Sequence, residues 1–260
     1  MRTAAINQLH GLFNEYGFPT ITKENLKKPA SRNELIEECF GESSILSELA
    51  RNLDRSITLT EETIAKLEDM VKEHILERNP EETVSLMSLP RVGVLTAGAF
   101  IAYAGDCRRF AKPKQLRNYV ALIPYKEESG TSVDFTGGVV AYGCMAIRRN
   151  IMQSAWGIIN EAKKKRETIE DPKNTCINPE FNVFEEIYMR NFYQGKKGQK
   201  IAVKIANKLL TIAWTLVRSD QVWNGCDINA LNKKLKTNKI AIKIKAIDEG
   251  WHPIIEGSND

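Results

Sequence analysis

A serine hydroxyl and a pair of guanidinium groups are the side chains of this sequence best suited to chemistry. Ser129 and Gly130 lie in the glycine-rich segment 123–143, and Arg148 and Arg149 follow it at the predicted start of a helix. A hydroxyl acts as a nucleophile when neighbouring groups activate it. Cations at a helix N-terminus bind phosphate, because the free N–H groups and the dipole of the helix attract an anion. The spacing therefore predicts that a nucleophile and a phosphate clamp meet here.

A helix, a tight turn and a second helix are predicted just before this segment, over residues 81–101. Pro90 and Gly93 interrupt an apolar pattern that resumes at Val94. In a helix-hairpin-helix module, glycines in the turn let backbone amides approach a DNA phosphate at the positive end of the second helix. Arg91 stands where such a module usually has its first glycine. Arg91 and Gly93 are therefore candidate DNA-binding residues; the alternative is a plain helical turn.

Two lysines extend this basic region. Lys112 precedes a short predicted helix at 113–122, and Lys126 lies where the helical period is lost. The alternation of residues 131–136 predicts a short strand before a turn at Gly137-Gly138. A connection of this length in a compact domain is usually functional. Lys112 and Lys126 are therefore further candidates for DNA binding.

The apolar periodicity predicts a mainly α fold. One long helix is expected over 43–78, because apolar residues recur at three- or four-residue steps without an internal glycine or proline. At 1.5 Å per residue it would be roughly 50 Å long, and it needs a partner: a second helix of the chain, or a coiled coil with a second copy. Ser31 with Glu34 predicts a capping box for a shorter helix. The other predicted helices are 3–16, 31–40, 144–166, 184–192 and the strongly apolar 201–217, which we expect in the core.

Composition excludes several classes of protein. The chain has 260 residues, a net charge of +4 and 42% hydrophobic residues, enough for a sizeable core. No apolar stretch approaches the roughly 18 residues of a membrane span, and the N-terminus does not resemble a signal peptide, so we expect a cytoplasmic protein without membrane contact. The 5 cysteines are widely spaced and odd in number, which indicates free thiols and no zinc site.

The ordered set of motifs resembles a known family. The chain is similar to the C-terminal transposase domain of the insertion sequence 110 family, also labelled IS116/IS110/IS902. The resemblance covers most of residues 1–222. The residues that carry it are Leu89-Pro-Arg-Val-Gly-Val-Leu-Thr-Ala, Gly105-Asp106 with Phe110, Leu116-Arg-Asn-Tyr-Val-Ala-Leu-Ile-Pro124, Ser129-Gly130, Gly138, Gly143 and Arg148-Arg149.

The resemblance implies a DNA recombinase with a serine nucleophile, which matches Ser129 here. It also implies a RuvC-like N-terminal domain whose acidic residues bind Mg²⁺, and a structured guide RNA that selects the target DNA. A serine that attacks a phosphodiester conserves the bond energy as a phosphoserine link, so strands can be broken and rejoined without ATP. DNA, guide RNA and a second copy of the chain are therefore the expected partners.

The sequence also departs from the family pattern. The chain starts where the acidic domain should be ending, so we expect no cofactor in this chain and no recombination by it alone. Arg91 replaces a hairpin glycine, and Cys144 stands where asparagine is common. The predicted domains are a remnant of the N-terminal domain at 1–41, a coiled-coil-like arm at 42–80, the transposase domain at 81–222 and a basic tail at 223–260.

Two alternatives remain at this point. One is a non-catalytic helix-hairpin-helix DNA-binding protein that keeps the basic residues without the chemistry. The other is a tyrosine recombinase using Tyr188 or Tyr193, which would need a histidine and an arginine in an H-x-x-R arrangement. None of the histidines, His10, His74 and His252, has one, so the second alternative is disfavoured.

Overall fold

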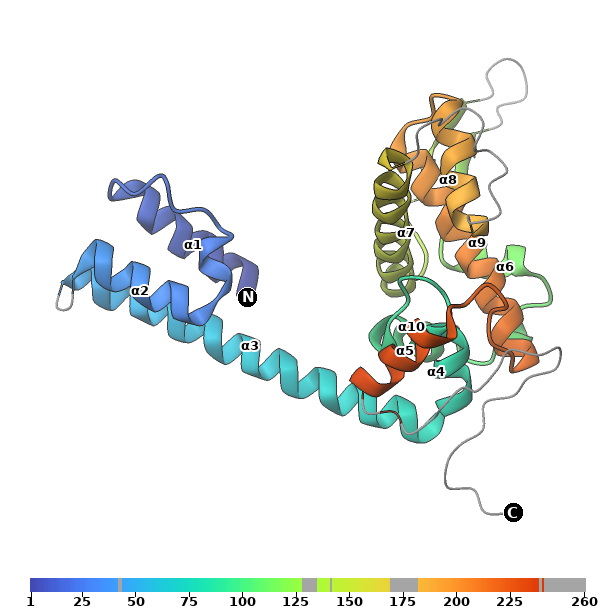
Figure 1. Ribbon diagram of the computed structural model, residues 1–260, viewed down its shortest axis with the longest axis horizontal. Coiled ribbons are helices and arrows are strands. Elements are labelled where there is room, and N and C mark those ends of the chain that lie inside the picture. The colour runs from blue at the N-terminus through green and yellow to red at the C-terminus, as the bar shows by residue number, and fades with distance from the viewer. Residues whose placement is uncertain (42–43, 128–134, 141, 169–181, 239, 241–260) are drawn as a thin grey trace. The chain divides into compact units, whose positions relative to one another are not determined.

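The protein is mainly helical, as predicted (Figure 1). The computed structural model describes residues 1–41, 44–127, 135–140, 142–168, 182–238 and 240, and for strand residues 124–127 and 135–139 it describes the backbone. The chain divides into two compact units, Met1–Val71 (unit 1) and Lys72–Asp260 (unit 2). In the described part of the chain, no helix is both long and apolar enough to cross a bilayer.

The described elements follow in chain order. The α-helices are α1 (Arg2–Glu15), α2 (Pro29–Phe40), α3 (Ile45–Arg78), α4 (Pro80–Met87), α5 (Val94–Ala104), α6 (Pro113–Tyr119), α7 (Met145–Glu167), α8 (Val183–Tyr193), α9 (Gly198–Ser219) and α10 (Ile228–Thr237). The 3-10 helices are η1 (Asn25–Lys27) and η2 (Cys107–Arg109), and the strands are β1 (Pro124–Glu127) and β2 (Phe135–Val139).

Unit 1 has its own core, built from α1, α2 and the adjoining part of α3. The rings of Phe13 and Phe40 stack with centroids 5.0 Å apart. Helix α2 begins at Pro29 and ends before Gly41, whose φ of 71° lies in the left-handed region that glycine adopts freely. The predicted capping box at Ser31 is wrong, because Pro29 already has the φ of a first helical residue and needs no N–H there. Ser31 therefore lies inside the helix.

A buried arginine joins α2 to α3 within unit 1. The side chain of Arg32 is 0% exposed and forms ion pairs with Asp54 and Glu61. Its Nη1 also donates to the carbonyl of Leu26 at 3.2 Å, and its Nη2 donates to Thr58 Oγ1 at 3.2 Å. A buried charge requires such partners, because removing it from water is costly. The charge of Arg32 is thus matched by two carboxylates on one helix.

The long predicted helix is present as α3 and runs through the boundary between the two units. Its unit 1 part leaves several large apolar side chains exposed, although neighbouring Ile57 is fully buried. The exposed ones are Ile45, Leu49, Leu59, Ile64, Leu67, Met70 and Val71.

Helix α9 is the central element of unit 2. The predicted core character of 201–217 is confirmed, since Ile205, Leu209, Leu210 and Ala213 are all 0% exposed. Helices α4, α6, α7 and α8 and the 3-10 helix η2 pack against it, and Figure 1 shows α8 running alongside it. The helix that carries Arg148 and Arg149, α7, is among the elements that surround this apolar helix.

The glycine-rich segment contains a two-stranded antiparallel sheet. Strand β1 pairs with β2, with Lys126 opposite Thr136 and Glu127 opposite Phe135. The predicted turn at Gly137-Gly138 is wrong, because both glycines lie inside β2, where pairing with β1 fixes an extended backbone that local sequence signals did not reveal. The predicted strand at 131–136 overlaps β2 only at its end, and residues 131–134 lie outside the described residues.

Helix α10 was not predicted. Its N-cap is Asp227, whose carboxylate accepts from the N–H groups of Asn229 and Ala230. An aspartate before an apolar residue is a helix-start signal, so the sequence did contain the information. Leu231 and Leu235 bury one face of α10 against the unit 2 core.

Replacing Arg32 by methionine should destabilise unit 1 by about 3–5 kcal/mol, because Asp54 and Glu61 then lose their buried cation. Hydrogen exchange of α1 and α2 in the full chain measures this locally. Arg55→Met is the matched control, because the Arg55 guanidinium is exposed and donates to Asn52 on the same helix. Equal exchange rates in both variants would show that the buried pairs do not hold unit 1 together.

Candidate nucleic-acid interface

The connection between α4 and α5 has its left-handed residue at Arg91. The φ of Arg91 is 59°, whereas that of Gly93 is −104°. A non-glycine residue in this region is strained by its Cβ, so Arg91 occupies the backbone conformation that a hairpin glycine would adopt without strain. Gly93 is exposed at the N-cap of α5, which has no side-chain cap. The first N–H groups of α5 are therefore not satisfied by a capping side chain.

The side chain of Arg91 lies along α7. Its Nη2 forms an ion pair with Glu161 Oε1 at 2.5 Å, and both side chains are about half exposed. A Cβ placed on Gly157 would lie 3.0 Å from Arg91 Cγ, so this glycine leaves room for the arginine stem. Ser154 Oγ also donates to the carbonyl of Arg91 at 2.9 Å. Arg91 thus ties the α4–α5 connection to α7.

A lysine of α10 holds the same connection from another side. Lys234 Nζ donates to the carbonyls of Met87 at 3.1 Å, Leu89 at 3.2 Å and Val92 at 3.4 Å. Burial is the main reason that the pKa of Lys234 is lowered, and the charge of Arg91 lowers it further. The sequence did not reveal this role, since Lys234 lies in a run of lysines that resembles a solvated helix face.

The two ends of the glycine-rich segment meet beside α6. Cys144 N donates to the carbonyl of Tyr119 at 2.9 Å. A Cβ on Gly143 would lie 2.5 Å from that of Ala121, and the φ of Gly143 is 114°, so this close approach requires glycine. The two ends of the segment, around Leu122 and Gly143, are called its neck below. The contacts of Gly143 and Cys144 fix this neck beside α6.

The predicted arginine pair is present in the first turns of α7, and its two side chains have different surroundings. Arg148 is half-buried, and its Nη1 donates to the carbonyl of Val140, next to β2, at 2.7 Å. Arg149 is exposed. Arg148 and Ser154, which binds Arg91, are six residues apart on α7, or about 9 Å along its axis. Helix α7 thus contains Arg148 and also binds the connection that contains Arg91. The structure records no direct contact between Arg91 and Arg148.

The remaining predicted residues are placed only in part. Ser129 and Gly130 lie outside the described residues, and Lys126 is described as backbone of β1. Lys112 is the exposed N-cap of α6, where its N–H donates to Gln115 Oε1 at 3.2 Å. The roles of all these residues stay predictions.

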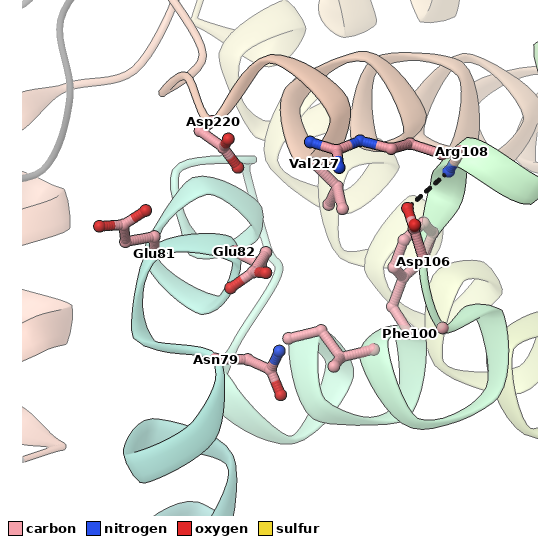
Figure 2. Close-up of a pocket in the computed structure, with 10 residues that line it drawn as sticks. Asn79, Glu81, Glu82, Phe100, Asp106, Arg108, Val217 and Asp220 are labelled. Carbon is pink, nitrogen blue, oxygen red and sulfur yellow. Dashed lines mark hydrogen bonds between the residues drawn. The ribbon is translucent and has the colours of Figure 1, made fainter.

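A cleft of about 500 Å³ lies between α4, α5, η2 and the end of α9. Figure 2 shows Glu82 and Asp220 pointing into it, Glu81 pointing away, and Arg108 extending across it. Asp106 Oδ1 accepts from the N–H of Arg108 at 2.8 Å. Among the described residues, no three His, Cys, Asp or Glu side chains are grouped to hold a metal ion. The cleft therefore does not fit the Mg²⁺ site that the family resemblance implies for its N-terminal domain.

Comparison with known proteins gives the same family as the motifs. Residues 84–169 match the family described as Transposase IS116/IS110/IS902 family. This match covers about a third of the chain. The matched range includes every predicted site residue, from Arg91 to Arg149.

Individual relatives cover most of the chain at low identity. The transposase for insertion sequence element IS1111A of Coxiella burnetii is 22% identical over 85% of the chain and 56% of its own length. A protein of Pseudomonas aeruginosa named "Probable family 20 transposase" is 23% identical over 83% of the chain and 59% of its length. The pilin gene-inverting protein of Moraxella lacunata is 22% identical over 73% and 54%. The chain thus spans little more than half the length of these relatives.

Replacing Lys234 by methionine should destabilise unit 2 by about 1–3 kcal/mol, because buried carbonyls lose their charged donor. Burial lowers the pKa of Lys234, so the unfolded chain keeps this proton to higher pH than the folded chain. The free energy of unfolding therefore rises as pH increases from the pKa of Lys234 in the folded chain to its pKa in the unfolded chain. This rise should be smaller in the variant. Urea unfolding followed by the fluorescence of Trp156 and Trp223 at several pH values measures both effects.

The exposed Lys236 of the same helix provides the control variant Lys236→Met. It removes the same charge from α10 without removing a bond to the α4–α5 connection. If both variants change the urea midpoint and its pH dependence equally, the three carbonyl bonds of Lys234 are not important for stability.

Proposed function

We propose that this chain is the serine-transposase part of an insertion-sequence transposase, which cuts and rejoins DNA strands through Ser129. The observation that carries the proposal is the family match over residues 84–169, since this range contains Ser129 and all the predicted DNA-binding residues. The relative named for inverting a pilin gene supports an activity in DNA rearrangement.

In the proposed reaction, Ser129 Oγ attacks the phosphorus of a phosphodiester. The new bond is a phosphoserine ester, and the bond to the leaving strand breaks, so that the strand end departs as a hydroxyl with the proton that Ser129 loses. A hydroxyl of a second strand then attacks the phosphoserine and restores Ser129. The number of phosphoester bonds stays constant, so no nucleotide cofactor is consumed.

The proposed reaction requires cations around the phosphorus, because negative charge on the phosphoryl oxygens must be stabilised in the transition state. Arg148 and Arg149 at the start of α7 are assigned this role, with Lys126 and the amide of Gly130 beside Ser129. The contact of Arg148 with the carbonyl of Val140 supports this assignment, because it keeps a guanidinium at the end of β2.

The α4–α5 connection and Lys112 are proposed to bind the DNA backbone. The exposed Gly93 at the uncapped N-terminus of α5 suits a phosphate oxygen. Arg91, already half exposed, would add a cation beside it. Such contacts position a duplex without reading its sequence, and a structured guide RNA would supply the target choice, as the family resemblance implies.

The reaction can be tested with a DNA substrate that carries a bridging phosphorothiolate at the scissile position. Its thiolate leaves without protonation, so the test does not depend on a general acid. The full chain should form a covalent protein–DNA adduct, and mass spectrometry should place the DNA on Ser129. Ser129→Ala should abolish the adduct while leaving DNA affinity within about twofold, since neither a backbone contact nor a charge is removed.

An adduct that persists in Ser129→Ala would rule out this nucleophile. DNA binding without any adduct from the wild-type chain would instead indicate the non-catalytic DNA-binding protein. Ser132→Ala, in the same segment, is the matched control and should form the adduct normally.

We also propose that α3 pairs with α3 of a second copy. Seven large apolar side chains of its unit 1 part are exposed, and Ile64, Leu67 and Val71 follow the three- and four-residue steps of a coiled-coil seam. An exposed apolar stripe of this kind on a long helix usually marks an interface.

Leu67→Glu should convert a dimer into a monomer in sedimentation-velocity experiments, because a carboxylate in the seam must be desolvated on pairing. Ala65→Glu adds the same charge two positions earlier, roughly 160° away around the helix, and should leave the dimer intact. A wild-type chain that sediments as a monomer at tens of micromolar would contradict the pairing.

A further inference from the structure

A basic hollow of about 400 Å³ lies where α6, α8 and α9 meet, outside the residues assigned above. The cations that line it are Arg117 from α6 and Lys204 and Lys208 from α9. No carboxylate is among the lining residues that the structure describes, and none of these three cations has a recorded ion pair there. The hollow therefore concentrates positive charge without an internal counter-ion.

Two ammonium groups share a single acceptor at this hollow. Lys204 Nζ and Lys196 Nζ both donate to Asn191 Oδ1, at 2.6 and 3.0 Å. The amide of Asn191 is buried, and its orientation is fixed because Nδ2 donates to the carbonyl of Ile187 at 2.7 Å. Like charges this close repel each other, and the pKa of Lys204 is lowered, mainly by its contact with Lys196 and then by burial. An anion between the two ammonium groups would relieve the repulsion.

Two side chains that line the hollow each have a polar atom that lacks a partner. Arg117 Nε and Asn207 Oδ1 are buried without a hydrogen bond. Asn207 cannot be reoriented without loss, since its Nδ2 already donates to the carbonyl of Leu122 at 2.8 Å. An unpaired buried donor or acceptor costs free energy, so these two atoms suit a ligand that both accepts and donates hydrogen bonds. Nucleic acid has phosphate oxygens as acceptors and base N–H groups as donors.

The hollow adjoins the neck of the glycine-rich segment. Leu122 lies two residues before β1. Its carbonyl accepts a hydrogen bond from Asn207 Nδ2, and its N–H donates to the carbonyl of Arg117 at 3.1 Å. Asn207 and Arg117 thus fix the position of Leu122, directly before the segment that contains Ser129. A phosphate bound here would be fixed relative to that point, and such positioning is a large part of catalysis in phosphoryl transfer.

We infer that the hollow between α6, α8 and α9 binds a backbone phosphate of the DNA strand on which the chain acts, with Arg117, Lys204 and Lys208 as its ligands. This inference rests on the proposed function and adds a binding site to it. The three cations neutralise the phosphate, and Asn207 accepts from a neighbouring base or from bound water. Lys196 and Asn191 position Lys204.

The test measures duplex DNA binding of the full chain by fluorescence anisotropy over a range of NaCl concentrations. Lys204→Gln with Lys208→Gln should weaken binding about tenfold or more at low salt, because charged hydrogen bonds to the phosphate are lost. The slope of log affinity against log salt should become shallower by about 1, the value expected for one phosphate contact. Arg117→Gln should act in the same direction.

The charge-matched control is Lys233→Gln with Lys236→Gln, two exposed lysines of α10. It should leave the salt slope unchanged. Lys208→Gln alone is the variant that is safest for folding, since no hydrogen bond of Lys208 is recorded within the described residues, and circular dichroism verifies that each variant is folded.

The outcomes separate this inference from the proposed function. If the wild-type chain binds DNA but the hollow variants match the control in affinity and slope, the hollow is not a phosphate site and the proposed function is unaffected. If the hollow variants weaken DNA binding as expected while no adduct forms on Ser129, the site is supported and the nucleophile is wrong. A larger effect on RNA of the same sequence than on DNA would overturn the assignment to a DNA strand.

Discussion

Burial of the apolar face of α9 is the constraint on which unit 2 depends. Ile205, Leu209 and Leu210 cannot be removed from water by a single neighbour, and α4, α6, α7 and α8 each cover part of this face. The transfer of apolar surface out of water is the main driving force of folding and has no preferred direction. It therefore brings the surrounding helices together but does not by itself fix the segments that connect them.

The connecting segments are fixed by single polar side chains that reach their carbonyl groups. Lys234 binds the α4–α5 connection, Asn207 binds Leu122 before β1, and Arg148 binds Val140 after β2. Trp214 Nε1 similarly donates to the carbonyl of Phe110 at 3.0 Å. A buried carbonyl without a donor costs free energy, so each of these bonds defines where a loop lies. The proposed DNA-binding parts are held by these bonds rather than by apolar packing alone.

Charge is unevenly distributed over unit 2. The hollow between α6, α8 and α9 is lined by cations, whereas Glu82 and Asp220 face the cleft between α4, α5 and α9. A polyanion is attracted by the first surface and repelled by the second. The proposed path of DNA therefore follows the α6 side of α9 and the start of α7, and avoids the acidic cleft.

The sequence by itself determined most of the helices and the resemblance to a transposase family. Apolar periodicity located α3, α7, α8 and α9, because one buried helix face leaves a repeat of three to four residues. The ordered glycine and arginine motifs indicated the resemblance to the transposase family, since each motif reflects a local backbone requirement. The left-handed conformation of Arg91 is of this kind: the sequence showed an arginine at a glycine position, and the structure shows the backbone that a glycine would have.

Only the tertiary structure decided which polar side chains meet. Lys234 resembles any surface lysine in the sequence, and Arg117 is separated by tens of residues from Lys204 and Asn207. Local propensity carries no information on such pairs, because they form only after α9 has gathered its neighbours. The turn expected at Gly137-Gly138 was wrong for a related reason, since pairing with β1 extends a backbone that the two glycines alone would allow to turn. Periodicity follows from the chain's own geometry, whereas a site made by several helices follows from how those helices pack.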